Sequence, residues 1–408
     1  MSFNTFAFHP QINAGISSAG YTTPTPIQSQ AIPAIMSGKD VLGLAQTGTG
    51  KTAAFVLPIL QRLMKGPRGK LRALILAPTR ELAEQTHIAI SQLGRQTGLR
   101  SLTIYGGVSA APQLKGLRSG VDIAVACPGR LLDLYGQKKI NFKDIEVLIL
   151  DEADQMFDMG FLPSIRRIVS ALPRQRQTLL FSATMPDKIR ELTKEILHDP
   201  VTVEIRVSEP VDTIDHAFYM VENTRKREML LNILEDSGSG QVLVFTRTKH
   251  RAKKLAHQLR KAECSATALE GNMSQNQRQA AMSKFRKGRV KVMVATDIAA
   301  RGIDVSRVSH VINYDVPYTV EAYTHRTGRT GRMERLGTAL SLVTHEDLKT
   351  VRNIKRQTGI TLQRLQMEGF PAEVPPAPPK EANTRPRSKS GQRRSNSGGR
   401  RYPAKTRS

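Results

Sequence analysis

Short segments that are apolar almost throughout recur along this chain, and helical patterns separate them. The clearest of these segments are residues 40–44, 73–77, 123–126, 147–150, 178–181, 242–245, 290–295, 308–313 and 339–343. Strands that are apolar on both sides are typical of a sheet whose two faces are covered. Helical patterns such as residues 79–93 and 249–261 lie between them. This alternation predicts an α/β fold built from parallel sheets with helices on both faces.

The alternation comes in two blocks, which predicts two domains. We place the first at residues 1–205 and the second at residues 216–370, joined by a linker at residues 206–215. From residue 371 the sequence PAEVPPAPPK is followed by Arg, Lys, Ser, Gly and Asn with almost no apolar residue. Such a segment cannot bury enough apolar surface to fold alone, so residues 371–408 are predicted to form a disordered tail, Pro-rich and then Arg/Lys-rich.

The charge balance is strongly basic. Lys and Arg number 61 against 35 Asp and Glu, which gives a formal net charge of +26. A balance of this size favours polyanionic partners, because contact with phosphates releases their counterions. A nucleic acid is the first expectation. An acidic membrane surface and a generically basic soluble protein are the alternatives.

Other features of the sequence disfavour some compartments and cofactors. No run of about 18 apolar residues occurs, so no transmembrane helix is expected. The first residues, MSFNTFAFHP, lack the basic and apolar regions of a secretory signal. Cys127 and Cys264 lie far apart and form no CxxC pair, so neither a disulfide framework nor a cysteine zinc site is expected. The expected location is the cytoplasm.

The sequence AQTGTGKT follows the apolar run 41–44 and opens a helical pattern. It fits GxxxxGK[ST] except at the first position, where Ala45 replaces Gly. Gly48 and Gly50 allow backbone N–H groups to turn toward phosphate oxygens. Lys51 can neutralise β- and γ-phosphate charge, and Thr52 can bind Mg²⁺. The alternative is a chance Gly/Thr-rich turn. The predicted ATP site comprises Ala45, Gln46, Thr47, Gly48, Thr49, Gly50, Lys51 and Thr52.

Carboxylates follow the apolar run 147–150, in the sequence Asp151-Glu152-Ala153-Asp154. This position predicts the carboxyl edge of a parallel sheet, where such sheets bind ligands. Asp151 suits the Mg²⁺ shell, and Glu152 suits positioning and deprotonating a water for attack on a γ-phosphate. Acidic pairs more often cap helices or lie in solvated loops. A spacing of 100 residues after Lys51 favours the catalytic interpretation.

The second block contains the sequence HRTGRTGR at residues 325–332. Its arginines, at a spacing of three, could form a solvated basic turn. Alternatively, Arg329 and Arg332 could act as arginine fingers toward a transferring phosphoryl group. In that case ATP would lie between the two domains.

Together these motifs resemble those of the DEAD-box ATP-dependent RNA helicases, and further family motifs follow in family order across residues 3–332. GYTTPTPIQ at residues 20–28 resembles the Q motif, here taken as residues 3–31, with Phe3 at its upstream aromatic position. PTREL at 78–82, Gly106-Gly107, and Ser182-Ala183-Thr184 match motifs of the first domain. Residues 245–248, Gln275 with Arg278, TDIAARGID at 296–304 and residues 314–317 match those of the second.

The resemblance implies two tandem RecA-like P-loop domains that hydrolyse ATP with Mg²⁺. It implies that Gln28 and Phe3 bind adenine and that Asp304 contacts the ribose. It also implies sequence-nonspecific contacts to single-stranded RNA or short duplexes, since phosphate and 2′-OH contacts carry little sequence information. The implied RNA residues are Arg80, Gly107, Arg130, Thr248, Arg278 and Thr296. The implied coupling residues are Asp154, Ser182, Thr184, His325 and Arg326.

Within the family, a compact core with a basic tail looks most like the bacterial RhlE type, with a monomeric core. Unwinding would be local, and partners would be ribosomal precursors or RNA-decay machinery. Three positions depart from the family pattern: Cys127 replaces Thr, Glu270 replaces a frequent His, and Thr327 replaces Ile. Two other functions stay open. One is an RNA chaperone or annealing protein that uses ATP to time RNA release, and the other is a DNA translocase, which the Q motif and the DEAD string disfavour.

Overall fold

The computed structural model describes residues 2–46, 48–205, 214–238, 240–300, 308–331 and 336–371. Thr47, Asp304 and Arg332 lie outside these residues, as do most of the predicted linker and nearly all of the predicted tail. The chain divides into two units after residue 374. The domain boundaries given above stay predictions. Below, the first lobe denotes the described residues up to 205, and the second lobe those from 214 to 371.

The first lobe alternates strands and helices from its N-terminus. Its strands are β1 (Val41–Leu44), β2 (Ala73–Leu76), β3 (Ser101–Ile104), β4 (Ile123–Ala126), β5 (Val147–Leu150), β6 (Gln177–Ser182) and β7 (Val201–Glu204). Its helices are η1 (Phe3–Phe6), α1 (Pro10–Ser18), α2 (Pro26–Met36), α3 (Lys51–Leu63), α4 (Arg80–Leu93), α5 (Ala111–Arg118), α6 (Pro128–Gly136), α7 (Ala153–Asp158), α8 (Leu162–Ser170) and α9 (Asp187–Ile196).

The second lobe repeats the alternation. Its strands are β8 (Ile214–Met220), β9 (Gln241–Phe245), β10 (Ala266–Leu269), β11 (Val292–Ala295), β12 (Val308–Asn313), β13 (Gly337–Val343) and β14 (Gln363–Leu365). Its helices are α10 (Lys226–Asp236), α11 (Lys249–Lys261), α12 (Gln275–Arg286), α13 (Asp297–Ala300), α14 (Val320–Thr327), η2 (His345–Asp347) and α15 (Leu348–Thr358).

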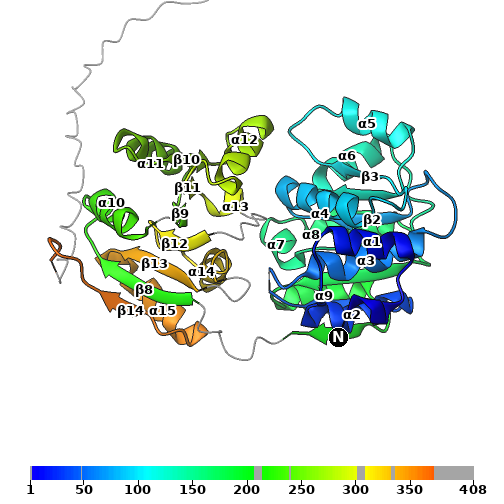
Figure 1. The fold of residues 1–408 in the computed structure, drawn as a ribbon, viewed down its shortest axis with the longest axis horizontal. Coiled ribbons are helices and arrows are strands. Elements are labelled where there is room, and N and C mark those ends of the chain that lie inside the picture. Colours follow the sequence, from blue (N-terminus) through cyan, green and yellow to red (C-terminus); the bar gives the residue numbers. More distant parts are fainter. Residues whose placement is uncertain are drawn as a thin grey trace, which may run out of the picture. The chain divides into compact units, whose positions relative to one another are not determined.

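Each lobe has one sheet of seven strands among the described residues (Figure 1). The strand orders are β3-β4-β2-β5-β6-β1-β7 and β10-β11-β9-β12-β13-β8-β14. Every pairing in both sheets is parallel. The predicted α/β class with parallel sheets is confirmed. A parallel sheet also brings the carboxyl ends of all its strands to one edge, which is where the motif residues lie.

Burial on both faces explains why the central strands are apolar throughout. In β2, Ala73 and Ile75 belong to one apolar cluster, whereas Leu74 and Leu76 belong to another on the opposite face. Helices α1 to α4 contribute to the first of these clusters, and α6 to α9 contribute to the second. In the second lobe α10 and α11 cover one face, whereas α12, α14 and α15 contribute to the clusters of the other.

The strands that sequence reasoning did not name are mostly those at or next to a sheet edge. They are β3, β7, β8, β10 and β14. In β7 and β14 most residues are partly or fully exposed, so these strands lack the continuous apolar run that reveals a central strand. None of the described helices combines the length and apolar character that a membrane crossing requires.

One lysine of the second lobe is buried. Lys226 opens α10 with 2% of its surface exposed. Its Nζ donates to the Tyr314 carbonyl oxygen at 2.9 Å and lies 3.8 Å from Oδ2 of Asp347. Burial lowers the pKa of the Lys226 ammonium to about 8, and attraction to Asp347 only partly opposes this.

We predict that Lys226 makes the stability of the second lobe depend on alkaline pH. Below pH 8 both the folded and the unfolded state hold the proton. Between pH 8 and about 10.5 the folded state releases it first, so the free energy of unfolding rises across this window. The rise amounts to roughly 3–3.5 kcal/mol, at 1.36 kcal/mol for each pKa unit between 8 and 10.5.

The measurement is chemical denaturation of the wild type and of Lys226→Met at several pH values. The difference between their unfolding free energies should grow with pH and stop growing near pH 10.5. Lys284→Met, at an exposed position of α12, serves as the control. A difference independent of pH would show that Lys226 keeps an ordinary pKa.

Candidate nucleotide and nucleic-acid site

The loop between β1 and α3 has the backbone that phosphate binding requires. Gly48 and Gly50 have φ angles of 90° and 94°, a region that residues with a Cβ rarely adopt. A Cβ at Gly50 would also lie 2.5 Å from Nε2 of Gln28. Gly50 is the N-cap of α3, so the unpaired N–H groups and the positive dipole end of a 13-residue helix lie at the loop.

Lys51 is the first residue of α3, and its side chain turns back across this loop. Its Nζ is buried and donates to the Ala45 carbonyl oxygen at 2.7 Å. The ammonium also attracts the carboxylate of Asp151. A buried cation beside exposed backbone N–H groups fits the phosphates of a nucleotide.

Gln28 lies against the same loop. Its Nε2 donates to the Gly50 carbonyl oxygen at 3.1 Å, and its Oε1 accepts from the Thr25 N–H at 3.0 Å. Phe3 is buried and stacks on Tyr21, with ring centroids 6.1 Å apart and an interplanar angle of 24°. The adenine contacts of Gln28 and Phe3 stay predictions. Tyr21, 41% exposed, is a further aromatic at this place, and its position inside GYTTP was the available signal.

Asp151 and Glu152 follow β5 at the carboxyl edge of the first sheet. Burial, and then repulsion from Glu152, raise the pKa of the Asp151 carboxyl well above its usual range, whereas Lys51 lowers it. Glu152 has a left-handed backbone with φ 53° and ψ 55°. Its Oε2 is buried and has no hydrogen-bond partner among the described residues. A strained residue with an unsatisfied carboxylate is costly, and such residues concentrate at functional sites.

These residues fit a magnesium–nucleotide complex. Asp151 provides a buried carboxylate that a cation would stabilise in its charged form, and Thr52 provides a hydroxyl one residue after Lys51. Carboxylate and hydroxyl oxygens are the ligands that Mg²⁺ uses together with phosphates. The fit rests on the unsatisfied Glu152 oxygen and the glycine backbone described above.

Asp154 connects the end of β5 to the segment that follows β6. Its Oδ2 accepts hydrogen bonds from the N–H groups of Ala183 and Thr184, at 3.1 and 2.9 Å, and from the Thr184 hydroxyl at 3.1 Å. The Ser182 hydroxyl accepts from the Asp154 N–H and donates to the Thr184 carbonyl oxygen. The three predicted coupling residues of the first lobe are thus in direct contact.

The predicted RNA residues of the first lobe also meet. The guanidinium of Arg80 lies against Gly107, where a Cβ would collide with it. Arg130 donates through Nη2 to the Val108 carbonyl oxygen at 3.2 Å. Its Nη1 is buried without a hydrogen-bond partner among the described residues. Two guanidinium groups therefore flank residues 107–108, which suits contact with a phosphate backbone.

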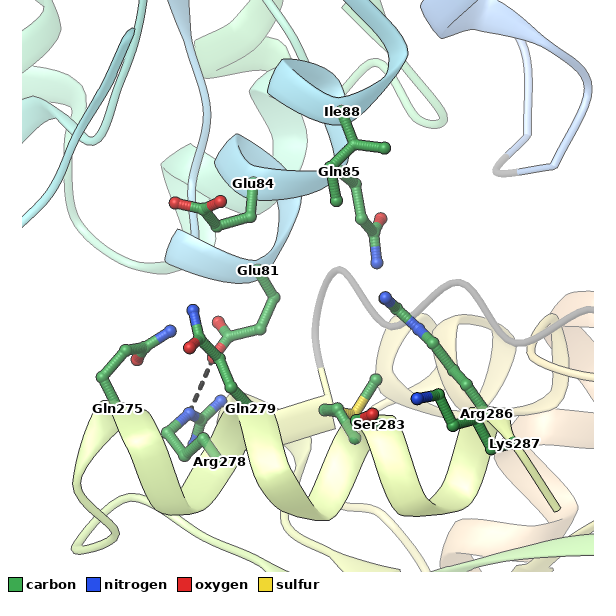
Figure 2. A pocket seen from close by; sticks show the side chains of 11 residues that line it. Glu81, Glu84, Gln85, Ile88, Gln275, Arg278, Gln279, Ser283, Arg286 and Lys287 are labelled. Carbon is green, nitrogen blue, oxygen red and sulfur yellow. Dashed lines mark hydrogen bonds and ion pairs between the residues drawn. The ribbon is translucent and has the colours of Figure 1, made fainter. Parts of the chain in front are cut away.

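Arg278 of α12 is already engaged by protein groups. Its Nε forms an ion pair with Oε1 of Glu81 at 2.7 Å, and the two side chains point toward one another from α12 and α4 (Figure 2). Its Nη1 and Nη2 donate to the carbonyl oxygens of Glu270 and Ala299 at 3.2 Å each. Contact between Arg278 and RNA stays a prediction, and it would compete with these bonds.

Arg326 is a buried connection between motifs of the second lobe. It forms a two-pronged ion pair with Asp297, at 2.5 Å from Nε and 2.8 Å from Nη2. Its Nη1 donates to Oδ1 of Asn313 at 3.0 Å and to the Asp315 carbonyl oxygen at 2.7 Å. Sequence reasoning missed Asp297 and Asn313. The signals available were the place of Asp297 inside TDIAARGID and the position of Asn313 at the carboxyl end of an apolar strand.

A chain of buried polar groups extends from this connection. Asn313 donates to the Ser341 hydroxyl at 3.2 Å, and Ser341 partly opposes the rise that burial causes in the pKa of Tyr323. The Tyr323 hydroxyl lies 2.9 Å from Nδ1 of His216 on β8. Burial lowers the pKa of His216 to about 4, so this histidine is neutral at physiological pH.

The remaining second-lobe residues occupy the carboxyl edge or its neighbouring helices. Arg329 is buried, and its Nε donates to the His325 carbonyl oxygen at 3.2 Å. Nε2 of His325 is buried without a partner among the described residues. Thr248 is the N-cap of α11 and accepts from the Arg251 N–H at 3.2 Å. Thr296 directly follows β11.

Two of the departures from the family pattern have a local explanation. Thr327 is buried, and its hydroxyl donates to the Tyr323 carbonyl oxygen at 3.1 Å, so the polar group is satisfied inside its own helix. The Glu270 carboxylate accepts from the Asn272 N–H at 2.6 Å, and its carbonyl oxygen accepts from Arg278.

The third departure, Cys127, is the N-cap of α6 and makes no side-chain capping bond. Burial raises the pKa of its thiol to about 12, so the group stays protonated. We predict that Cys127→Thr stabilises the first lobe by about 0.5–1 kcal/mol, because a threonine hydroxyl accepts from the N–H groups that open a helix. The new hydroxyl should also tighten RNA binding by roughly 0.5–1.5 kcal/mol.

Thermal unfolding and RNA titration of the two proteins check both parts. Cys127→Ser should reproduce the capping gain, whereas Cys127→Ala should not. Equal stability of the threonine, serine and alanine variants would show that Cys127 only fills space beside the first apolar cluster.

Comparison with known proteins identifies the family to which this chain belongs. The DEAD/DEAH box helicase family matches residues 25–192, and the Helicase conserved C-terminal domain family matches residues 225–334. An ATP-dependent RNA helicase named DeaD from Mycobacterium tuberculosis is 43% identical over 371 residues, covering 90% of this chain and 65% of that protein. DEAD-box ATP-dependent RNA helicase RhpA of Helicobacter pylori is 41% identical, with 90% of this chain and 74% of the relative covered.

A solved structure of S. cerevisiae Dbp5 bound to RNA and ADP BeF3 superposes with a TM-score of 0.80 at 32% identity. It covers 89% of this chain and 95% of that chain. The two sheets of seven parallel strands are therefore tandem RecA-like domains. The chain spans 65% of the length of its DeaD relative and 74% of its RhpA relative. With both family models matched and relatives above 40% identity, the chain belongs to the DEAD-box family of ATP-dependent RNA helicases.

Proposed function

We propose that this protein is an RNA-stimulated ATPase that uses Mg²⁺ and ATP to separate short RNA duplexes locally. The observation that carries the proposal is the Glu152 carboxylate, which is buried, left-handed in backbone and unsatisfied at the sheet edge beside Lys51 and Asp151. A group in that condition is costly, and such groups concentrate at functional sites. Relatives that carry the name ATP-dependent RNA helicase support the same assignment.

The chemistry follows from the positions of these side chains. Thr52 and Asp151 would hold Mg²⁺, which supplies charge neutralisation at the phosphates when it is bound. Lys51 and the N–H groups of the glycine loop bind and orient the phosphates. Glu152 orients a water and accepts its proton, and its free Oε2 is the atom that would take that proton. Gln28 connects the adenine side of the site to Gly50.

Each lobe also contains a charged group that connects a nucleotide motif to a neighbouring segment. In the first lobe Asp154 bonds to Ala183 and Thr184. In the second lobe Arg326 joins Asp297, which follows the predicted RNA residue Thr296. Because each of these bonds joins two motifs directly, a shift at one motif would displace its partner. This supports the proposed coupling of ATP hydrolysis to RNA binding.

We place the cellular role in ribosome assembly or RNA turnover, with ribosomal precursors or RNA-decay machinery as partners. The basic segment from residue 371 supports an RNA-tethering tail and the RhlE-like sub-assignment. The relatives reported above carry the names DeaD and RhpA instead. Strand separation that needs ATP hydrolysis distinguishes this role from an annealing chaperone, whose activity would persist without nucleotide.

The first prediction concerns the catalytic base. Glu152→Gln should retain ATP and RNA binding but lose RNA-stimulated phosphate release, because an amide keeps the shape of the carboxylate but accepts no proton. Lys51→Ala should lose nucleotide binding or turnover. Phosphate release with and without single-stranded RNA, and binding of a fluorescent ATP analogue, are the measurements. Wild-type phosphate release by Glu152→Gln would remove Glu152 from this role.

The second prediction concerns Arg329. Arg329→Ala should lower the ATPase rate by several orders of magnitude, about 10³–10⁵-fold, while ATP binding by the first lobe persists. Arg329→Lys should restore little, because an ammonium lacks the planar fork of a guanidinium. Single-turnover hydrolysis separates rate from binding. A rate within threefold of the wild type in both variants would contradict the finger role.

A further inference from the structure

Helix α11 has an unusually uniform charge. Its 13 residues include six Lys or Arg and two His, and no acidic residue. Its buried side consists of Ala252, Leu255, Ala256 and Leu259, which pack in the apolar cluster over the second sheet. The basic groups therefore collect on the outward side of the helix.

Four residues on this outward side form what we call the α11 stripe: Lys253, Lys254, His257 and Lys261. All four are exposed. Within the described residues none of them makes a side-chain hydrogen bond or ion pair. Their neighbours differ, because Arg251 pairs with Asp315 at 2.8 Å and Lys249 donates to Asn272 at 3.0 Å. The stripe thus carries charge that no protein group neutralises.

The spacing of the α11 stripe follows the helical repeat, so its members lie along one side of the helix. With a rise of 1.5 Å per residue, the helix extends about 20 Å. Its N-cap is Thr248, one of the predicted RNA residues, at the carboxyl end of β9. The stripe therefore begins close to the predicted RNA site and leads away from it.

We propose that the α11 stripe binds the phosphate backbone of an RNA duplex that adjoins the strand held in the core site. The inference rests on the proposed function and extends it to a second contact surface. The α11 helix has no Phe, Tyr or Trp, which are the large rings on which unpaired bases stack best, and stacking is the usual means of holding single strands. Duplex RNA is instead recognised through its phosphates and 2′-hydroxyls, which lysines can contact without reading sequence.

Charge excludes two other occupants. The chain has a net charge of +26, so a second copy would be repelled. The segment after residue 371 is itself rich in Arg and Lys and cannot neutralise the stripe. An acidic protein would fit the charge, but only RNA is expected at the helix N-terminus where the stripe begins. The duplex is therefore the occupant that both observations favour.

The test compares two matched variants of the full chain. One replaces Lys253, Lys254 and Lys261 with Glu. The other replaces Lys349, Arg352 and Lys355 of α15 with Glu. These three residues are also exposed and also lie on a helix without acidic residues. Both variants change the net charge equally, and Glu and Lys have similar helix propensities. Binding is measured on a blunt RNA duplex, a duplex with a single-stranded overhang, and the single strand alone, over a range of salt concentrations.

The α11 variant should bind both duplexes at least tenfold more weakly than the wild type. The slope of log K against log salt concentration is negative, and its magnitude should decrease by about 3, one for each lost phosphate contact. Single-strand binding and single-strand-stimulated ATPase should stay within twofold of the wild type, as should every property of the α15 variant. A milder variant, with Gln at the three α11 positions, should also weaken duplex binding more than single-strand binding, but by a smaller factor. Circular dichroism checks that each protein is folded.

Three results would overturn the proposal. Equal weakening by the α11 and α15 variants would mean that general charge governs binding. Equal weakening for duplex and single strand would place a single strand on the stripe. Unchanged duplex affinity in the α11 variant would leave an acidic protein as the remaining occupant. If the wild type showed no RNA-stimulated ATPase at all, the proposed function would be rejected instead. The duplex-binding measurements would still show whether the α11 stripe binds RNA.

Discussion

Strands buried on both faces leave no side chain of their own free for chemistry, and the rest of this structure depends on that constraint. In β2 and β5 every residue is enclosed by helices, so polar groups are excluded until the strand ends. Because the strands are parallel, those ends meet at one edge of each sheet. Asp151 and Glu152 are the first two residues after β5, and Ser182 is the last residue of β6. The chemistry is concentrated at that edge because the interior of the sheet cannot hold it.

Two buried charges then organise the edges, and each is fully satisfied. Asp154 accepts bonds from Ala183 and Thr184, and Arg326 is held by Asp297 and Asn313. Removing one partner of such a group leaves part of its charge uncompensated, which destabilises the folded state. The surrounding loops therefore have few arrangements that keep the charge satisfied. Glu152 shows the opposite case, since one of its buried oxygens is left unsatisfied beside these satisfied groups. The contrast supports the proposal that Asp154 and Arg326 hold the site whereas Glu152 takes part in the reaction.

Much of the fold could be predicted from local pattern, because central strands and the glycine loop have signals confined to a few neighbouring residues. Thr79 and Thr248 likewise precede helices as N-caps in a form that sequence reveals. The partners of Arg326 could not be predicted, because Asp297 and Asn313 follow different strands and meet only after the sheet forms. The edge strands β7 and β14 were not predicted for a related reason. Their partly exposed residues interrupt the continuous apolar run on which the prediction of a strand depends.

The basic residues of the chain do not contribute equally to RNA binding. Arg326 and Arg278 are already paired with carboxylates, so RNA gains little from them unless those pairs break. Lys226 is buried, and its lowered pKa shows that its charge is already disfavoured there. Only cations that face water and lack protein partners can release counterions from a nucleic acid at full effect. Net charge alone therefore overstates what this chain offers to RNA, and the positions of its unpaired lysines decide where RNA can bind.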